Sequence, residues 1–243
     1  MAKVTLENLN KIFVSKIGKD VKAVNDFNLL LEDGEILALL GSSGCGKTTT
    51  LRMIAGFETA TSGQIKIGER IVNDLKPADR NVAMAFEGYA LYPPLTVKDN
   101  IAFSLMREKI SKDKVDSKVM EVAELLEITD ILERYPPSIS GGQQQRVSLA
   151  RALVRDSDAL LLDEPMSQLE PQLRAVLRAR VKDYIQHNNK TVIFVTHDQT
   201  EAVALADKIA VMENGDLKQL ASPYEISAKP VSYTHLRAHE TPL

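Results

Sequence analysis

A lysine and a threonine at the end of a glycine-rich loop are well suited to bind a polyphosphate. The loop, Gly41-Ser42-Ser43-Gly44-Cys45-Gly46-Lys47-Thr48, fits the pattern G-x-x-x-x-G-K-[ST]. Its glycines allow successive backbone N–H groups to point inward, and a following helix adds its positive N-terminal end. We expect Lys47 to reach the outer phosphates of a nucleotide and the Thr48 hydroxyl to bind Mg²⁺. The alternative is a glycine-rich turn that binds nothing.

Two carboxylates and a histidine also stand at the ends of apolar runs. Asp163 and Glu164 follow the run 159–162, and His197 comes after Thr196 at the end of the run 191–195. An aspartate in such a place can hold Mg²⁺ through a water molecule. The glutamate beside it can polarise the water that attacks a terminal phosphate, and we expect His197 to contact that phosphate. The alternatives are a helix cap or surface turn for the carboxylates and a structural role for the histidine.

A second segment resembles an anion-binding helix start. It is Ser140-Gly141-Gly142-Gln143, which supplies a serine hydroxyl and the N–H groups of two glycines before a helical pattern. A helix N-terminus favours negative charge. Because the chain already has one phosphate loop, this segment needs a phosphate of its own or one that a partner holds. An ordinary capping motif is the alternative.

The segments around these residues alternate between strand and helix. The apolar run 35–40 precedes the glycine-rich loop, and residues 48–55 after it have helical character. The run 159–162, a helix over 171–187 and the run 191–195 follow the same order. Such alternation predicts an α/β fold with a largely parallel sheet, and parallel sheets bind ligands at the carboxyl ends of their strands.

Other segments predict antiparallel strands. Residues 3–13 and 21–31 carry loosely alternating apolar positions, and short hairpins are expected at 64–72 and 208–220. Asn214-Gly215 would form the turn of the second of these hairpins. An antiparallel β subdomain therefore accompanies the predicted parallel sheet.

A helical insert is predicted between residues 87 and 158. Helical spacing over 97–109 and 112–134 ends at Tyr135-Pro136-Pro137, where two prolines prevent the helix from continuing. The nucleotide-binding core would then comprise residues 1–86 and 159–230. The tail 231–243 fits no periodic pattern.

The totals restrict the class of protein. The chain has 243 residues and a net charge of -3, with 44% hydrophobic and 26% charged residues, so a globular protein without a nucleic-acid partner is expected. No apolar run approaches the roughly 20 residues that span a bilayer, which favours a cytoplasmic protein. The one cysteine, Cys45, excludes an internal disulfide. We expect it to be a small loop residue, with a redox role as the alternative.

Taken together, these motifs resemble the ATP-binding-cassette family, the nucleotide-hydrolysing subunits of membrane transporters, over about residues 3–230. The resemblance implies a P-loop NTPase fold that binds ATP and Mg²⁺, with Thr49 also at the nucleotide. It implies a head-to-tail dimer, homo- or heteromeric, in which residues 140–143 of one subunit cover the ATP on the other subunit's phosphate loop. Phe13 takes the position that stacks on adenine, although a core position for Phe13 is the alternative.

Three tracts most resemble carbohydrate importers of the maltose and glycerol-phosphate kind: Tyr89 to Pro93, Gly141 to Arg146 and Thr196 to Ala202. The resemblance implies uptake of a sugar or sugar derivative, at the inner face of the cell membrane. Membrane-spanning permease subunits would dock at Glu87–Pro94, and a solute-binding protein would act indirectly. Packing within the helical insert is the alternative explanation for Tyr89, Leu91 and Tyr92.

The sequence departs from the family pattern in places. Glu87 stands where the family usually has glutamine; it could still bind Mg²⁺, but it adds negative charge beside the phosphates. Glu170 replaces an aspartate, and Ile139 a leucine. The tail, including His235 and His239, fits neither the family nor a metal site, and resembles translated adapter sequence where these importers continue into a regulatory domain; a disordered tail is the alternative.

Competing functions differ in class. Import of another solute keeps the fold and the ATPase. A chromosome-maintenance or translation-associated ATPase would usually add long coiled coils or tandem cassettes, and neither occurs in this sequence. A weakly hydrolysing, nucleotide-binding regulatory partner is made conceivable by Glu87 and Glu170.

Overall fold

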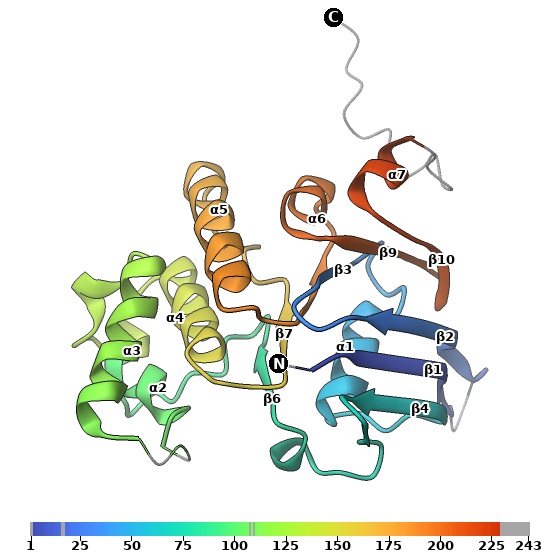
Figure 1. Ribbon diagram of the computed structural model, residues 1–243, viewed down its shortest axis with the longest axis horizontal. Helices are drawn as coiled ribbons and strands as arrows, with labels where there is room; N and C mark the ends of the chain where they lie inside the picture. The colour runs from blue at the N-terminus through green and yellow to red at the C-terminus, as the bar shows by residue number, and fades with distance from the viewer. Residues whose placement is uncertain (1, 16–17, 107, 109, 229–243) are drawn as a thin grey trace, which may run out of the picture.

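The structure is a computed structural model, and it describes residues 2–15, 18–106, 108 and 110–228 (Figure 1). The tail 231–243, with its two histidines, lies outside these residues. The predictions for this tail therefore remain predictions.

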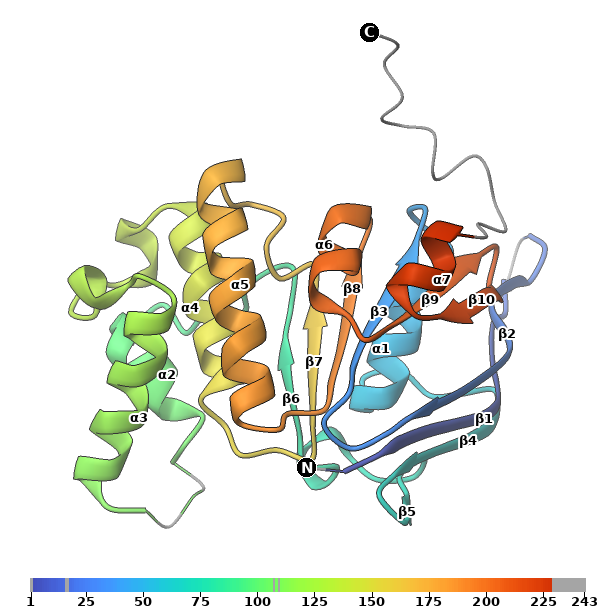
Figure 2. The ribbon, with the colours of Figure 1, turned by 45° about the horizontal axis from the view of Figure 1, so that its top comes forward.

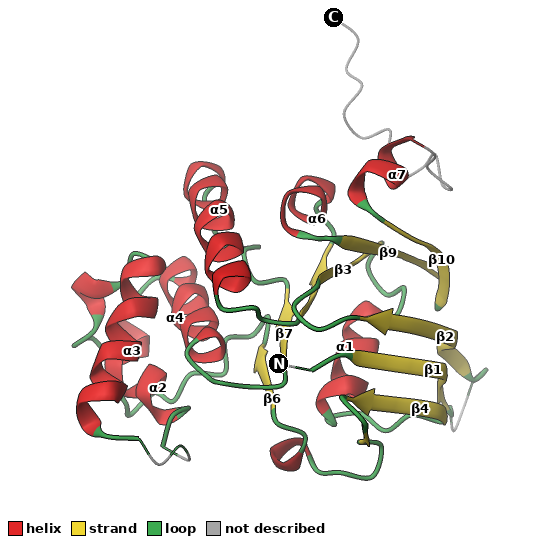
Figure 3. Ribbon diagram, viewed as in Figure 1, coloured by secondary structure: helices red, strands yellow, loops and turns green. Residues whose placement is uncertain are grey.

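One ten-stranded sheet organises the chain, in the order β5-β4-β1-β2-β10-β9-β3-β8-β7-β6 (Figure 3). The strands from β9 to β6 pair in parallel, whereas β5, β4, β1 and β2 pair antiparallel. The predicted α/β fold with an antiparallel part is confirmed. The strands are β1 (Val4–Phe13), β2 (Val21–Leu31), β3 (Ile36–Gly41), β4 (Ser62–Ile67), β5 (Arg70–Ile71), β6 (Val82–Ala85), β7 (Ala159–Asp163), β8 (Val192–Thr196), β9 (Lys208–Glu213) and β10 (Asp216–Ala221).

Strand burial explains why the two parts of the sheet differ. Every residue of β3, β7 and β8 is buried, whereas β1 has buried positions separated by partly exposed ones. Continuous apolar strands belong to sheets that are covered on both faces, and alternating strands to sheets with one wet face. The central strands are therefore held rigidly, with their carboxyl ends free to carry chemistry.

Helices cover both faces of the parallel strands (Figure 2). Helix α1 and the antiparallel strands share one hydrophobic cluster, and the other helices share a second cluster on the opposite face. Among the described residues, none of these helices is both long and apolar enough to cross a bilayer. The helices are α1 (Lys47–Ala55), α2 (Val97–Phe103), α3 (Lys112–Leu125), α4 (Gly141–Leu153), α5 (Pro171–His187), α6 (Gln199–Leu205) and α7 (Pro223–Ala228), with 3₁₀ turns η1 (Pro77–Asp79), η2 (Thr129–Ile131) and η3 (Pro136–Ser138).

The two helices predicted for the insert are shorter than their sequence pattern indicated. Helix α2 ends at Phe103, not at 109, and α3 ends at Leu125, not at 134. After α3, Glu127 takes a left-handed φ of 53°. Its N–H bonds Glu124 O and the N–H of Ile128 bonds Ala123 O, which is the Schellman closure of a helix end. A non-glycine residue makes this closure, so no glycine marks the end of the helix.

Among the described residues, the insert shares its hydrophobic core with the central sheet. Helix α4 packs against β6 and β7 as well as against α2 and α3, and a single hydrophobic cluster runs through all of these elements. Helix α4 therefore packs directly on the strand that ends at Asp163. We keep the division into a core of residues 1–86 and 159–230 and an insert of residues 87–158 as a proposal.

Candidate functional site

The glycine-rich loop lies against two strands. At two of its glycines the neighbouring backbone leaves no room for a side chain. A Cβ on Gly46 would lie 2.2 Å from Ala23 O on β2, and a Cβ on Gly41 would lie 2.3 Å from Met212 O on β9. Gly46 also has a φ of 108°, which side-chain-bearing residues rarely adopt. The glycines therefore let the loop curl tightly while it touches β2 and β9.

The N-terminus of α1 is open. Gly46 is its N-cap, within the described residues no side chain caps it, and its first turn has no acidic residue. Lys47 is buried, and its Nζ donates to Gly41 O at 2.8 Å and to Ser42 O at 2.9 Å. Uncapped N–H groups beside a lysine form a site for an anion.

A cavity of about 190 Å³ lies over this helix start. Its lining brings together most of the residues expected there: Ser43, Gly44, Gly46, Lys47, Thr48, Thr49, Glu87 and Glu164, with Ala23 from β2. Cys45 is buried behind it, with Sγ 3.8 Å from the Nζ of Lys47. Such burial suits a small loop residue.

Asp163 lies directly across from the loop. It ends β7, is 4% exposed, and its Oδ1 accepts a hydrogen bond of 3.0 Å from the Thr48 hydroxyl. Burial raises the pKa of Asp163; the Thr48 hydrogen bond opposes this shift, and the charges of Glu87 and Glu164 add to it. This end of the sheet therefore concentrates negative charge that a cation would relieve.

The residues present fit Mg²⁺ only as part of a ligand set. Among the described residues, no group of three or more His, Cys, Asp or Glu side chains is placed to hold a metal. Mg²⁺ usually takes one or two carboxylates, and completes its shell with waters and substrate phosphates. A hydroxyl and a carboxylate in contact, beside an anion cradle, match that requirement.

Glu164 and His197 meet at the ends of neighbouring strands. Oε1 of Glu164 lies 3.0 Å from Nδ1 of His197, and β7 pairs in parallel with β8. Glu164 has a left-handed φ of 47° and its N–H bonds Val195 O. The sequence placed each residue at a strand end; the contact between them is a finding of the structure.

Sequence reasoning missed Gln145, which holds the segment after β7. This side chain is 3% exposed, and its Nε2 donates to Glu164 O at 2.9 Å and to Ser167 Oγ at 3.1 Å. Its Oε1 accepts from Gln168 N at 2.9 Å. One signal was available, because Gln145 falls on the buried face of α4 together with Leu149, and a buried polar side chain needs partners.

The second predicted anion site is built differently. Ser140 caps α4 through a reciprocal capping box: its Oγ accepts from Gln143 N at 3.3 Å, and Gln143 Oε1 accepts from Ser140 N at 2.9 Å. None of the residues 140–143 lines the cavity over α1, and the two helices lie on opposite sides of the parallel strands (Figure 2). The chain does not bring its two predicted anion sites together.

Phe13 lies at the end of β1 and is 41% exposed. The alternative that it is a core residue is therefore wrong. Its ring is covered on one side by Lys11, whose Nζ lies 4.7 Å from the ring centroid.

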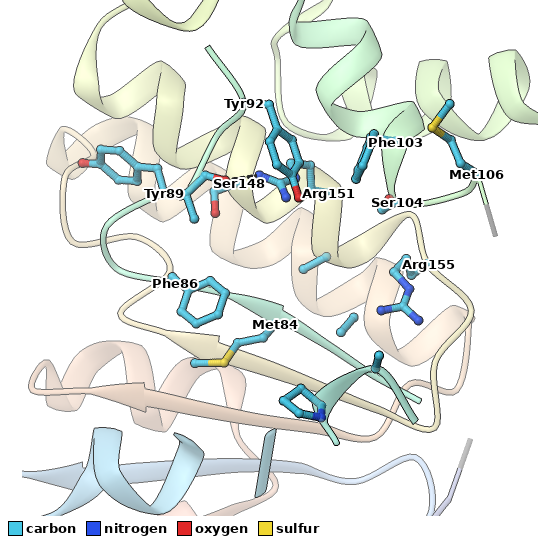
Figure 4. Close-up of a pocket in the computed structure, with 15 residues that line it drawn as sticks. Met84, Phe86, Tyr89, Tyr92, Phe103, Ser104, Met106, Ser148, Arg151 and Arg155 are labelled. Carbon is cyan, nitrogen blue, oxygen red and sulfur yellow. Dashed lines mark hydrogen bonds between the residues drawn. The ribbon is translucent and has the colours of Figure 1, made fainter. Parts of the chain in front are cut away.

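A groove of about 380 Å³ lies beside the 87–94 segment, between β6, α2 and α4 (Figure 4). Apolar and aromatic side chains dominate its wall, among them Met84, Phe86, Tyr89, Tyr92, Phe103 and Met106. The ring of Tyr92 packs on Phe103 with centroids 4.7 Å apart, and Arg151 lies 4.9 Å from the Tyr92 centroid. Tyr92 nevertheless remains 40% exposed, so internal packing and an available surface coexist.

Comparison with known proteins gives the same picture. Residues 24–167 match the family model described as ABC transporter. The chain is 44% identical over 232 residues to the sn-glycerol-3-phosphate import ATP-binding protein UgpC of Brucella abortus, covering 96% of this chain and 65% of that protein. It is 48% identical over 238 residues to the trehalose/maltose import ATP-binding protein MalK of Thermococcus litoralis, covering 96% and 63%.

A third relative is the xylose/arabinose import ATP-binding protein XacK of Haloferax volcanii, 42% identical over 231 residues and covering 95% of this chain and 60% of that protein. The chain thus spans 60% to 65% of the length of these relatives. A solved dimeric ATP-binding cassette in a post-hydrolysis state, bound to ADP and Pi, superposes with a TM-score of 0.83 at 27% identity over 90% of this chain and 98% of that one. With the phosphate loop, the Asp163–Glu164 pair and this fold in place, the chain belongs to the ABC transporter family.

Proposed function

We propose that this chain binds and hydrolyses ATP as the nucleotide-binding subunit of an importer. The observation that carries the proposal is the 3.0 Å hydrogen bond from Thr48 to Asp163, which joins an uncapped helix start to the carboxyl end of a buried strand. Thr48 also lines a cavity there, together with Lys47 and the carboxylates of Glu87 and Glu164. This is the arrangement that phosphoryl transfer from a magnesium nucleotide requires.

Each residue of the loop has a proposed task. The backbone N–H groups of residues 42–49 cradle the phosphates of ATP, and Lys47 exchanges its bonds to Gly41 O and Ser42 O for the outer phosphates. Thr48 and Asp163 would hold Mg²⁺, which when bound neutralises charge on the phosphates, with Glu87 as a further ligand. Phe13 supports the adenine ring by stacking.

Glu164 and His197, the pair at the strand ends, would carry out the hydrolysis step. Glu164 orients the water that attacks the terminal phosphorus, and His197 stabilises the charge that builds on the transferred phosphate. The contact of 3.0 Å between them lets each side chain hold the other in place. The P–O bond breaks to give ADP and phosphate.

The capped helix start completes a site on another subunit. Residues 140–143 lie far from the cavity of their own chain, so their N–H groups can reach only a phosphate held elsewhere. Two subunits, identical or homologous, would close head to tail over two ATP molecules. The solved relative that this fold superposes on is itself dimeric.

The groove of Figure 4 is the proposed docking place for a permease subunit. It is apolar, partly exposed and lies beside the Glu87–Pro94 segment, so a docked helix would contact the loop that leads from β6 toward the cavity. Closure of the dimer would then move the permease. The chain would work at the inner face of the membrane, with a solute-binding protein as an indirect partner.

The transported class is proposed from the relatives. Their printed names concern glycerol 3-phosphate, trehalose and maltose, and xylose and arabinose. A sugar or sugar derivative is the shared chemistry, and import of another solute is the alternative. A weakly hydrolysing regulatory subunit is a second candidate, because the charge of Glu87 acts on the already buried Asp163.

Phosphate release from the purified chain with Mg²⁺ and ATP tests the proposal. We expect Lys47→Ala to lower the rate about a hundredfold or more, since it removes a charge that acts on the transferred group. Lys66→Ala is the matched control, because Lys66 forms an ion pair with Glu7 on the antiparallel strands. Equal rates for the wild type and Lys47→Ala would contradict the proposal, and ATP binding without phosphate release would favour the regulatory alternative.

A further inference from the structure

A lysine lies on one face of the exposed ring that we propose for adenine. Lys11 and Phe13 are two residues apart on β1, at a point where the pairing with β2 shifts register. The Nζ of Lys11 lies 4.7 Å from the ring centroid. We infer that Lys11 is a positioning residue for the nucleobase, holding and polarising the Phe13 ring so that its other face stacks on a purine. The inference rests on the proposed ATP binding.

The ammonium group of Lys11 is held by hydrogen bonds to two oxygen atoms of the segment that follows α1. Lys11 is 8% exposed, and its Nζ donates to Glu58 Oε1 at 2.7 Å and to Thr59 O at 2.9 Å. A lysine ammonium has three N–H donors, so two are directed at oxygens and one is left for the ring. The lysine therefore keeps a single geometry under Phe13 instead of moving freely in solvent.

The ring is anchored while its exposed surface stays open. Phe13 remains 41% exposed although a cation covers one of its faces, so the opposite face is the one that a flat ligand can reach. A cation on one face of an aromatic ring withdraws electron density from it, which favours stacking of an electron-rich base on the other face. Restricting the ring also lowers the entropy cost of binding.

The position of the ring relative to the phosphate cavity suits a nucleotide. Phe13 pairs with Val21 on β2, and Ala23, two residues further along β2, lines the cavity over α1. Two strand residues span about 7 Å. A base on Phe13 and phosphates over Gly46 can therefore belong to one molecule.

Lys11 could instead serve only to tie β1 to the segment that follows α1, through Glu58 and Thr59. If that were its only role, a Lys11 variant would lose equal binding affinity for ligands with and without a base. Inorganic tripolyphosphate has the phosphates and no base, so comparing it with ATP separates the two roles. Lys11→Met removes the charge and keeps an unbranched side chain one atom shorter, whereas Lys11→Arg keeps a cation.

The binding assay uses an engineered reporter. The chain contains no tryptophan, so Phe13→Trp introduces one indole at the platform, and its emission is followed during titration with Mg-ATP or Mg-tripolyphosphate. Hydrolysis by proteins that keep Phe13 gives KM and kcat. Lys66→Met is the matched control, because the Nζ of Lys66 pairs with Glu7 Oε1 at 2.7 Å, as that of Lys11 does with Glu58.

We expect Lys11→Met to weaken ATP binding and raise KM about fivefold with unchanged kcat, and to leave tripolyphosphate binding unchanged. The ATP affinity and KM of Lys11→Arg and Lys66→Met should stay within about twofold of those of the protein without the substitution. The first variant keeps the cation, and in the second the substituted residue does not touch the ring. Unchanged ATP affinity in Lys11→Met, or equal weakening of ATP and tripolyphosphate, would overturn the inference while ATP binding by the wild type stands. Failure of the wild type to bind ATP would instead overturn the proposed function and the inference together.

Discussion

The two helix starts that could bind phosphate, at α1 and α4, are built on opposite plans. The N-terminus of α1 follows Gly46 and, among the described residues, receives no side-chain cap. The N-terminus of α4 is closed by a reciprocal capping box between Ser140 and Gln143. Both starts carry the same partial positive charge, so the difference lies in whether the donors are free.

If sites form between subunits, as we propose, the open start of α1 holds the phosphates of its own chain's ATP and the capped start of α4 covers the ATP of the other subunit. Open N–H groups at α1 pay a cost in helix stability, which a bound phosphate would recover. The capping box satisfies backbone N–H groups of α4 without any ligand, and Ser140 is exposed at this end of the helix. We propose that the first start is a cradle for the ATP of its own chain and that the second is a lid over the ATP of a neighbouring subunit.

The largest expected effect tests the chemistry that serves only the open start. Glu164→Gln keeps a side chain that can hydrogen-bond His197 but removes the carboxylate. We expect hydrolysis to fall about 10²- to 10³-fold, with ATP binding retained and an ATP-bound dimer accumulating. Phosphate release measures the hydrolysis rate, and gel filtration with Mg-ATP measures the accumulation of the dimer. Turnover at the wild-type rate would show that another group orients the water.

Removing the N-cap of α4 tests whether this helix start contributes to hydrolysis as a lid. Ser140→Ala should cost about 1 kcal/mol of stability, as N-cap losses do, and lower hydrolysis about tenfold because a hydrogen bond to a charged phosphate is lost. Thr96→Ala is the control, since Thr96 caps α2 through Asp99 N in the same way. The control should lose comparable stability and keep its turnover.

A mixed dimer decides whether the lid acts on the other subunit. One subunit carries Lys47→Ala and the other carries Ser140→Ala. If sites form between chains, one composite site keeps both residues and about half of the wild-type rate remains. If each site forms within a chain, both are damaged and the rate falls to that of the variants. The second result would remove the distinction between cradle and lid.

Gln145 connects the two regions, because it extends from α4 to the backbone of Glu164. Gln145→Leu leaves Glu164 O, Ser167 Oγ and Gln168 N without their partner. We expect kcat to fall about fivefold at unchanged KM, together with a loss of about 2 kcal/mol of stability. Gln144→Leu is the control, since the Nε2 of Gln144 donates to Pro136 O and Ile139 O, away from the segment after β7. A fall in kcat as large in the control would mean that stability alone explains the loss.

The smallest effect concerns a buried carboxylate behind His197. Glu201 is 4% exposed; its Oε2 accepts from the Thr196 hydroxyl, and its Oε1 has no partner among the described residues. Burial raises the pKa of Glu201, against the effect of the Thr196 hydrogen bond. Because the folded pKa exceeds the unfolded one, the charge costs stability above the folded pKa and nothing below the unfolded pKa.

We therefore expect Glu201→Gln to raise the free energy of unfolding by on the order of 1 kcal/mol at pH 8. The gain should shrink as the pH falls and vanish near the ordinary pKa of a glutamate. Urea denaturation at several pH values measures it. A gain that is independent of pH would contradict burial of the charged form, and hydrolysis at the wild-type rate would show that this residue supports the fold alone.

Much of the site was predictable because its residues are close in sequence and follow local rules. The glycine spacing before Lys47 fixes a loop, and the apolar runs before Asp163 and His197 fix strands whose carboxyl ends meet at one edge. The end of α3 was not predictable, because Glu127 adopts a left-handed conformation without glycine. The helical spacing continued past it, since the residues beyond are buried in the same cluster.

The family, the phosphate loop and the order of strands and helices could all be predicted from the sequence, because each depends on short patterns of glycine, charge and apolar spacing. Which of these pieces meet became clear from the folded chain. It placed Glu164 against His197 and Gln145 against the segment after β7, and it exposed Phe13 above Lys11. It also separated Ser140 from Lys47 by the width of the parallel strands. Those relations join residues far apart in the chain, and packing of buried surfaces, not local propensity, sets the distance between them.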